Sequence, residues 1–599
     1  MKAVILAAGA GRRMYPLTQE THKCLLPVGD STLVDRMLEG LLQVGVSQVM
    51  LLTGYRHDQL RAHLGDDYKG MPLEYVFNER FEDTNNVVSL LRALQGHDLK
   101  DDFLLLEADL IFDFSVLRRA LDSPAQNVAI LAPFKSGMDG TVAELRDGWV
   151  HDIIPPERQQ RDGVTRYKTV NVYKFSYDFA YGPLLQMLAY YTERFEENCY
   201  YEKILGMLIY AGQLRLKGEV LEDEAWAELD DPQDVVRAQA IFDGQRLLNQ
   251  LEYNFGGLWN FPVVDFNFIR NIYFPTDSMV EEIRQKLPEL MHNYGSRQAV
   301  MDRKMATFLR CPEEPLILLN GASQAYPILA EFYAGRQVLI PSPTFGEYSR
   351  VFGNADSFRD HPDESIDLSS RVGSYGLVVM VNPNNPTGTL WPTLTLWKWI
   401  LDHPKVDFLV DESFIDFSDQ PSLTTLLREK PVDNLIVLKS LGKSLGVPGL
   451  RMGYLYTHKQ SLHDYFKARL PIWNHNSLAE FFLETGLKHR EALQRSFVAT
   501  RQERERMGAL LLSSPGITRV WPSAANFFLV EVSEEVDLEA LLRHMLRLSG
   551  IYVKDISSKV DCRALRIAVR TAPDNDLFLD CWKKCYPLAA RPTTSAARA

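Results

Sequence analysis

The chain has 599 residues, of which 46% are hydrophobic and 24% charged, an ordinary balance for a soluble globular protein, and its length predicts several cores. The net charge of −13 argues against a broad nucleic-acid-binding surface, because phosphate contacts require clustered lysine and arginine; local pockets for small phosphates remain open. Six cysteines form neither a disulfide framework nor a paired zinc-ligand pattern, and no apolar run reaches the roughly 18 residues of a membrane span. We expect a cytoplasmic protein that binds small molecules and no nucleic acid.

Strand and helix patterns alternate through the first part of the chain. Strand-like runs fall at residues 2–7, 48–52, 73–77 and 103–107, and helical patterns fall at residues 33–42, 57–64 and 87–94. Strands that alternate with helices predict a mostly parallel sheet with helices on both faces. We therefore expect an α/β, doubly wound N-terminal domain.

A glycine-rich loop directly follows the first of these strands. Its N–H groups and Arg12 would meet the anionic oxygens of a triphosphate, and Lys23 would place a charge at the phosphates between which a bond changes. The candidate nucleotide-binding residues are Leu6, Ala8, Gly9, Gly11, Arg12 and Lys23, the last two also as catalytic residues. A dinucleotide-binding turn is the alternative, but the spacing does not match G-x-G-x-x-G. The loop resembles that of nucleotidyltransferases, which join a nucleoside triphosphate to a phosphorylated small molecule and release pyrophosphate.

Two aspartates stand at the ends of predicted elements. Asp109 follows the strand at 103–107, and Asp230 precedes a late helix. The resemblance implies that these two residues hold Mg²⁺ across the triphosphate and the attacking phosphate. Two hard carboxylates together with phosphate oxygens suit this cation. Ordinary strand-end and helix-cap roles are the alternative for either residue alone.

Further residues bear on the acceptor of the nucleotidyl group. The segment 78–90, which contains Asn86, resembles one found in cytidylyltransferases that act on phosphocholine-type substrates. Lys168 is a candidate for the acceptor phosphate. Tyr200, Tyr201 and Glu202 offer aromatic faces and a carboxylate for an alkylammonium group, although helix packing would explain the two tyrosines as well. The base is not readable from the residues, and cytosine is implied by the resemblance alone.

A domain boundary is expected near residue 245. An acidic first turn at residues 231–234 opens a predicted helix at 235–248, and the polar segment 245–257 ends in two glycines. We assign residues 1–245 to the N-terminal domain, residues 246–590 to a second domain and residues 591–599, which are small and polar, to a disordered tail.

The second domain carries a pattern suited to pyridoxal phosphate. Lys443 lies on a short glycine-punctuated turn, where its amine would bind the cofactor aldehyde, with Ser440 and Arg451 placed to hold the phosphate. Upstream, Asn385 would hydrogen-bond the pyridine 3-oxygen, and Asp411, which ends a predicted buried strand, would keep the pyridine nitrogen protonated. Each of these three strings taken alone has an ordinary structural explanation. Together with a fourth string upstream, at residues 320–323, they occur in the order that the chemistry requires.

Three more residues complete the predicted cofactor site. Ala322 and Ser323 follow the strand-like run 316–319 and would open a helix whose free N–H groups meet the phosphate, while Phe345 would stack on the ring. Residues 255–590 resemble the fold-type I aminotransferases, specifically the branch of histidinol-phosphate aminotransferase and threonine-phosphate decarboxylase. The resemblance implies large and small domains and a homodimer.

The substrate side of this site is less clear. Arg566 and Arg570 are four residues apart, so on one strand they would share a face and clamp a carboxylate and a phosphate together. A solvated strand edge is the alternative. Phe414 stands where many aminotransferases of the group carry tyrosine, a departure that favours the decarboxylase side by association only. The segment 261–270 lacks the branch's usual pattern, which leaves its substrate contacts open.

The combination predicts a bifunctional enzyme. Decarboxylation of phosphoserine or phosphothreonine would release a phosphorylated amine, and the first domain would join this amine to a cytidylyl group from CTP, giving CDP-ethanolamine or a similar product. One alternative is a transaminase of a phosphorylated amino alcohol, of histidinol-phosphate type, joined to a transferase of NTP-sugar type. Another alternative is that one domain is a degenerate module that regulates the other.

Overall fold

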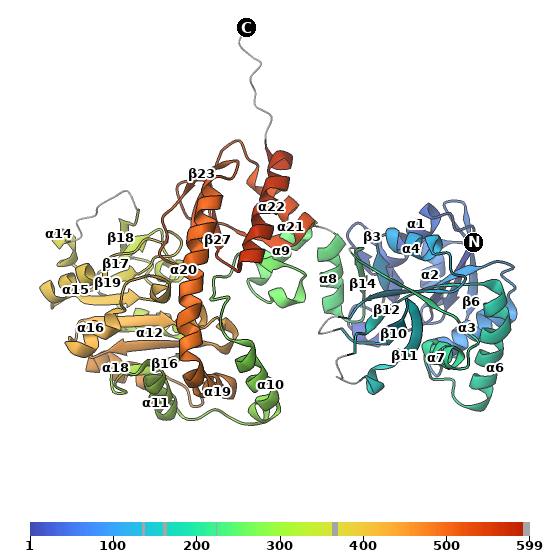
Figure 1. Ribbon diagram of the computed structural model, residues 1–599, viewed down its shortest axis with the longest axis horizontal. Helices are drawn as coiled ribbons and strands as arrows, with labels where there is room; N and C mark the ends of the chain where they lie inside the picture. The colour runs from blue at the N-terminus through green and yellow to red at the C-terminus, as the bar shows by residue number, and fades with distance from the viewer. Residues whose placement is uncertain (135–137, 160–163, 223, 243, 362–368, 591–599) are drawn as a thin grey trace, which may run out of the picture. The chain divides into compact units, whose positions relative to one another are not determined.

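The computed structural model describes residues 1–134, 138–159, 164–222, 224–242, 244–361 and 369–590 (Figure 1). The chain forms two compact units, and the division falls between Phe261 and Pro262, later than the predicted residue 245. The predicted disordered tail, 591–599, lies outside the described residues. Among the described residues, none of the helices combines the length and apolar character that crossing a membrane requires.

The first unit is built around a ten-stranded mixed sheet in the order β10-β11-β13-β9-β12-β7-β1-β4-β6-β5. The strands are β1 (Lys2–Ala7), β4 (Val49–Thr53), β5 (Asp67–Tyr68), β6 (Met71–Phe77), β7 (Phe103–Glu107), β9 (Val128–Pro133), β10 (Val142–Arg146), β11 (Trp149–Ile154), β12 (Tyr167–Phe175) and β13 (Lys217–Val220). The central strand β1 runs parallel to β4 and to β7. The glycine loop therefore leaves the sheet at the carboxyl ends of its central strands, where ligands of open α/β sheets bind.

Helices cover both faces of this sheet, as the alternating pattern predicted. They are α1 (Leu33–Gln43), α2 (His57–Leu64), α3 (Asn86–Gly96), α4 (Ser115–Asp122), α6 (Leu185–Arg194) and α7 (Tyr201–Tyr210). Successive residues of β1 enter two different cores: Val4 lies in one hydrophobic cluster and Ile5 in another. This alternation follows from the two-residue period of a strand and confirms the doubly wound arrangement.

The segment expected as a polar boundary is largely helical. Two helices, α8 (Pro232–Phe242) and α9 (Gly244–Asn254), take the place of the single predicted helix at 235–248. Leu247, Leu248 and Leu251 of α9 are buried. Their spacing places them on one face of the helix, and α9 packs against α8 within the first unit.

The second unit contains a seven-stranded sheet in the order β16-β22-β21-β20-β19-β17-β18. The strands are β16 (Leu316–Asn320), β17 (Val338–Ser342), β18 (Asp356–Arg359), β19 (Leu377–Val381), β20 (Asp407–Asp411), β21 (Leu435–Ser440) and β22 (Met452–Thr457). β19, β20 and β21 are parallel neighbours, and β22 runs antiparallel to β21 and β16. The carboxyl ends of the parallel strands therefore bring Asp411 and Ser440 to one edge of the sheet.

A smaller four-stranded sheet follows along the chain, in the order β23-β24-β27-β26. Its strands are β23 (Ile517–Val520), β24 (Phe527–Val532), β26 (Lys554–Asp555) and β27 (Ala564–Ala568). The 23-residue helix α20 (Arg490–Leu512) precedes this sheet, and Figure 1 shows it as the longest orange helix. The other helices of this unit are α10 (Asp277–His292), α11 (Gln298–Leu309), α12 (Ala325–Phe332), α13 (Gly346–Val351), α14 (Ser369–Val372), α15 (Thr393–Asp402), α16 (Leu423–Glu429), α17 (Leu441–Ser444), α18 (Gln460–Lys467), α19 (Ser477–Gly486), α21 (Leu538–Ser549) and α22 (Ala572–Ala589).

Candidate active sites

A cavity of about 1290 Å³ opens at the glycine loop of the first unit. Its lining includes the predicted nucleotide-binding residues and both predicted metal ligands: Leu6, Ala8, Gly9, Gly11, Arg12, Lys23, Asp109 and Asp230. Gly11 has φ 58°, in the left-handed region that favours glycine, and the short helix η1 (Arg12–Met14) begins directly after it. The loop thus faces a cavity large enough for a nucleotide.

Lys23 lies between the two aspartates that were predicted as metal ligands. Its Nζ is 2.9 Å from Asp109 Oδ2 and 3.5 Å from Asp230 Oδ1. Arg13 donates to Asp230 Oδ1 at 2.7 Å. Burial alone would lower the pKa of Lys23, but the charge and hydrogen bond of Asp109 and the charges of Asp230 and Glu228 together outweigh it, so the pKa is raised and the ammonium stays charged. The basic side chains of Lys23 and Arg13 are placed to attract a triphosphate, and the carboxylates are placed to bind a metal cation.

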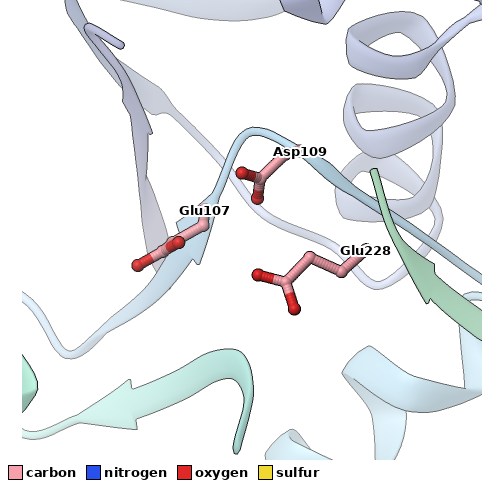
Figure 2. A group of neighbouring side chains, drawn as sticks. All are labelled: Glu107, Asp109 and Glu228. Carbon is pink, nitrogen blue, oxygen red and sulfur yellow. The ribbon is translucent and has the colours of Figure 1, made fainter. Parts of the chain in front are cut away.

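Three carboxylates converge on one point of this cavity. Glu107, Asp109 and Glu228 each present an oxygen atom, and these atoms lie within 4.8 Å of one another (Figure 2). Glu107 ends β7, and Glu228 ends β14 (Trp226–Glu228). Hard oxygen ligands at this spacing suit Mg²⁺. Glu107 and Glu228 were not predicted as ligands, although each stands two residues before a predicted aspartate. Of those two aspartates, Asp109 belongs to this group, whereas Asp230 lies outside it and pairs with Lys23 and Arg13.

The carboxylates of this cavity are crowded and removed from water. Burial raises the pKa of Glu228 to about 7 against the opposing charge of Lys168, whose Nζ lies 3.0 Å from Glu228 Oε2. Burial also raises the pKa of Glu107 well above its ordinary value, with the charge of Glu202 as the next cause. Repulsion among buried carboxylates is relieved when a divalent cation binds, so the residues present fit Mg²⁺.

The predicted acceptor residues lie at the same cavity, with one exception. Asn86, Lys168 and Glu202 line it. Asn86 joins two parts of the wall, because its Nδ2 donates to Glu107 Oε1 at 3.2 Å and its Oδ1 accepts from the backbone N–H of Tyr201 at 2.9 Å. Burial raises the pKa of Glu202 to about 7.

Tyr201 itself does not line the cavity. Its side chain is fully buried and packs edge-on against Tyr173, with ring centroids 5.9 Å apart. The preceding residue, Tyr200, is 59% exposed and lines the cavity. The prediction of Tyr201 as an aromatic substrate contact is therefore wrong, because helix α7 turns this ring into the core and leaves Tyr200 at the opening.

The candidate cofactor site of the second unit centres on Lys443, in α17 (Leu441–Ser444) at the end of β21. Burial, together with the charges of Arg566, Arg270 and Arg451, lowers the pKa of Lys443 to about 8 against the opposing charge of Asp411. An amine with this pKa is partly neutral near physiological pH, as attack on an aldehyde requires.

Asp411 is held by hydroxyl groups on both sides. Its Oδ2 accepts from Tyr348 at 2.7 Å, and its Oδ1 accepts from Ser413 Oγ at 2.5 Å. Burial raises the pKa of Asp411, while these hydrogen bonds and the charge of Lys443 oppose the increase. The donors thus favour the carboxylate form that a protonated ring nitrogen needs. Tyr348, which the sequence analysis did not mark, stands three residues after Phe345.

The predicted phosphate-binding residues lie together. Arg451 Nη2 donates to Ser323 Oγ at 2.7 Å, and Ala322 begins the turn η6 (Ala322–Gln324) after β16. A Cβ atom added to Gly321 would lie 2.6 Å from Arg451 Nη2, so glycine is what allows the guanidinium to reach the serine. Ser440 is the N-cap of α17, and its backbone N–H donates to Ser413.

Arg566 connects the predicted ring contacts to the predicted substrate side. Its Nη1 donates to Asn385 Oδ1 at 2.9 Å, and its Nη2 donates to the carbonyl of Asn267 at 2.9 Å. Phe345 is 38% exposed and lies 6.1 Å from the ring of Tyr326. An amine, a buried carboxylate, a serine and arginine pair and an oriented amide are the groups that pyridoxal phosphate requires, so the residues present fit this cofactor.

Arg570 does not share the face of Arg566, because β27 ends at Ala568. The Arg570 guanidinium donates to Asp574 Oδ2 at 3.1 Å and to the carbonyl of Asp265 at 3.0 Å. The expected clamp of two arginines on one strand is therefore wrong. The structure instead turns Arg270 toward the surroundings of Lys443, where its charge lowers the pKa of the lysine. Arg270 lies in the segment whose pattern gave no signal.

Two family models match the chain, one in each unit. A model of the MobA-like NTP transferase domain matches residues 3–169. A model of class I and II aminotransferases matches residues 265–580, which is more than half of the chain.

Three relatives show how far the likeness extends. The whole chain is 32% identical, over 623 residues, to a CMP-5'-(3-aminopropyl)phosphonate synthase of Streptomyces rubellomurinus and covers 98% of that protein. About half of the chain, 51%, is 31% identical to a histidinol-phosphate aminotransferase of Prosthecochloris aestuarii, covering 84% of it. A further match, over 49% of the chain, is 26% identical to an L-serine phosphate decarboxylase of Campylobacter jejuni, covering 80% of it.

Proposed function

Because the chain belongs to the class I and II aminotransferases and carries a MobA-like NTP transferase domain ahead of that region, we propose that its two sites act in sequence on one phosphorylated amine. The second unit decarboxylates an O-phospho-amino acid, phosphoserine or phosphothreonine. The first unit then transfers a cytidylyl group from CTP to the phosphorylated amine, giving CDP-ethanolamine or its homologue. By family resemblance, the enzyme is a homodimer through its second unit.

In the second unit, the residues of the chain bind, orient and move a proton. Ser323 and Arg451 would hold pyridoxal phosphate, which would supply an electron sink for the bond broken at Cα. Arg566 binds the α-carboxylate through its planar fork and, because Asn385 fixes its orientation, holds the bond to be broken in one direction. Lys443, with its lowered pKa, returns a proton to Cα.

In the first unit, charge compensation dominates. Lys23 and Arg12 stabilise the triphosphate as a phosphorus–oxygen bond breaks and pyrophosphate leaves. Glu107, Asp109 and Glu228 would hold Mg²⁺, which would supply positive charge to compensate the phosphates. Lys168, whose Nζ lies 3.0 Å from Glu228 Oε2, would hold the acceptor phosphate. No proton transfer is needed if the attacking phosphate oxygen is already ionised, so the site works mainly by position and charge.

The observation that carries this proposal is the presence of both sites in one chain. A decarboxylase needs no 2-oxo acid partner, and its product carries the phosphate and the ammonium group that the first cavity is lined to receive. Glu202 and the exposed Tyr200 offer the ammonium group a carboxylate and an aromatic face. The L-serine phosphate decarboxylase among the relatives supports this substrate class.

An aminoalkylphosphonate is a second candidate acceptor. One relative that matches the whole chain is a CMP-5'-(3-aminopropyl)phosphonate synthase, a name that describes a cytidylyl group joined to an aminoalkylphosphonate. A phosphonate replaces the bridging ester oxygen of a phosphate with carbon and leaves the attacking oxygens unchanged. The same cavity would therefore accept either acceptor, and the second unit would then decarboxylate a phosphonate-bearing amino acid.

Transamination is the alternative for the second unit, and the histidinol-phosphate aminotransferase among the relatives favours it. The two reactions differ in their need for a 2-oxo acid. We expect carbon dioxide release from the holoenzyme without 2-oxoglutarate; accumulation of the pyridoxamine form, rescued by 2-oxoglutarate, would instead establish a transaminase.

The deciding experiment incubates the purified protein with Mg²⁺, each of four nucleoside triphosphates, and phosphoserine, phosphothreonine or an amino acid that bears a phosphonate. Mass spectrometry identifies the products, while carbon dioxide and pyrophosphate are measured in parallel. We expect release of both carbon dioxide and pyrophosphate with CTP and one of these substrates. If neither is released from any combination, the proposed pathway fails.

A further inference from the structure

A buried carboxylate lies behind the candidate cofactor site. Asp360 follows β18, is 2% exposed, and donates its backbone N–H to the carbonyl of Ser342 at 2.9 Å. Its Oδ2 accepts hydrogen bonds from Asn384 Nδ2 and, at 2.8 Å, from Thr387 Oγ1. This carboxylate therefore anchors the loop that follows β19.

Asn384 ties that loop to a second loop, which follows β17. Asn384 Nδ2 also donates to the carbonyl of Pro343 at 2.8 Å, and Thr344 Oγ1 donates to Asn384 Oδ1 at 2.9 Å. Asp360, Thr344, Asn384 and Thr387 thus form one buried network, which we call the loop network.

Each loop in this network carries a proposed cofactor contact. Phe345 follows Thr344, and Asn385 follows Asn384. Asn385 Oδ1 accepts from Arg566, which leaves the Asn385 amide N–H groups for the cofactor. A shift of either loop would therefore move the ring-stacking side chain, the amide and the arginine together.

We propose that Asp360 is a positioning residue that fixes Phe345, Asn385 and, through Asn385, Arg566 at the cofactor. The inference rests on the proposed cofactor site, but it does not depend on which reaction occurs there. Removing the carboxylate leaves one N–H of Asn384 and the hydroxyl of Thr387 buried and unpaired, so the loop after β19 loses its anchor and can shift together with the loop after β17 that Asn384 ties to it.

The test compares Asp360→Asn with Asp360→Ala in the full-length holoenzyme. Oδ2 alone accepts both hydrogen bonds, so the amide oxygen of asparagine can take its place. We expect the dissociation constant of pyridoxal phosphate, measured by visible absorbance after equilibrium dialysis, to rise roughly ten- to a hundred-fold in Asp360→Ala. Asp360→Asn should stay within about threefold of the wild type, since it keeps the acceptor geometry.

Asp356→Ala is the matched control. Asp356 begins β18, the strand that Asp360 follows, is exposed, and accepts from the Tyr375 hydroxyl outside the loop network. Thr344→Val removes a single hydroxyl group from the network without a change of shape, and it should also raise the dissociation constant of the cofactor. This variant takes the place of Asp360→Ala if that protein does not fold. Wild-type cofactor affinity in Asp360→Ala or, where that protein does not fold, in Thr344→Val would overturn the inference, as would equal losses in Asp360→Asn and Asp360→Ala.

The same proteins separate this inference from the proposed reaction. Phosphoserine is added to each holoenzyme, and carbon dioxide is measured. If no protein decarboxylates it while the cofactor affinities follow the expected order, the proposed reaction fails and the role of Asp360 stands. If decarboxylation occurs but the affinities do not follow the order, the role of Asp360 fails and the reaction stands.

Discussion

At the scale of single residues, charge and burial decide what Lys443 can do. Burial removes solvation from its ammonium, and three arginines repel it, so its pKa falls to about 8. The sequence identifies this lysine by its glycine-punctuated turn. The arginines come from segments far apart in the chain, so their combined effect depends on the tertiary structure.

The pH dependence of cofactor uptake follows from this pKa. Only the neutral amine attacks the cofactor aldehyde, so the rate of uptake by the apoenzyme should rise with pH, then level off above about 8. A lysine with the ordinary value of 10.5 would continue to gain rate well beyond that point. The appearance of visible absorbance after stopped-flow mixing measures this rate at each pH. A profile that still rises steeply at pH 10 would contradict the lowered pKa.

The two arginines of the sequence prediction should now differ in effect. Arg566→Ala should raise KM for the amino acid and lower kcat, because the arginine both binds and orients the α-carboxylate, and a lost charge-assisted bond is worth about 1.5–3 kcal/mol. Arg570→Ala should leave kcat and KM close to wild type and lower the free energy of unfolding by about 1–2 kcal/mol, because its guanidinium bonds Asp574. Steady-state kinetics and denaturant unfolding measure both effects. A raised KM for the amino acid in the single variant Arg570→Ala would contradict this separation and support the two-arginine clamp.

At the scale of elements, helix α9 sets the end of the first unit. Its leucines are buried, although the segment looks polar in the sequence. The apolar face of a helix is visible in a sequence only when residues four apart are considered together. The boundary was predicted near residue 245 because the segment from there to the two glycines at its end looks polar. The antiparallel part of the first sheet, where β12 lies between β9 and β7 and runs antiparallel to both, likewise depends on long-range pairing.

Truncation tests this boundary. A fragment of residues 1–261 should be more stable than a fragment of residues 1–245, because the shorter one loses the buried side chains of Leu247, Leu248 and Leu251. Burial of such side chains is worth roughly 1.5–3 kcal/mol each, so the thermal midpoint should drop by several degrees or more. Differential scanning calorimetry of the two fragments makes the comparison. Equal midpoints would show that α9 contributes nothing to the first unit.

At the scale of the whole molecule, the two proposed activities should be separable. Lys443→Ala should abolish cofactor absorbance and decarboxylation but leave pyrophosphate release from CTP and supplied phosphoethanolamine, because the lysine lies in the second unit. Asp109→Asn should do the reverse, with nucleotidyl transfer lowered roughly 10²–10³-fold through weakened charge compensation. Assays of both activities on both variants provide mutual controls. Loss of both activities in either variant would show that the units depend on each other.

The sequence by itself determined the local pieces: the strands and helices of the first unit, the glycine loop, and the chain order of Asn385, Asp411 and Lys443. These follow from short-range periodicity and from motifs whose residues are neighbours in the chain. The tertiary structure alone decided which side chains meet. It added Glu107 and Glu228 to the acidic cluster, turned Tyr201 into the core, separated Arg570 from Arg566 and brought Asp360 behind the cofactor loops. The physical reason is that burial and hydrogen bonding join residues hundreds of positions apart, whereas a sequence pattern reports only its own neighbours.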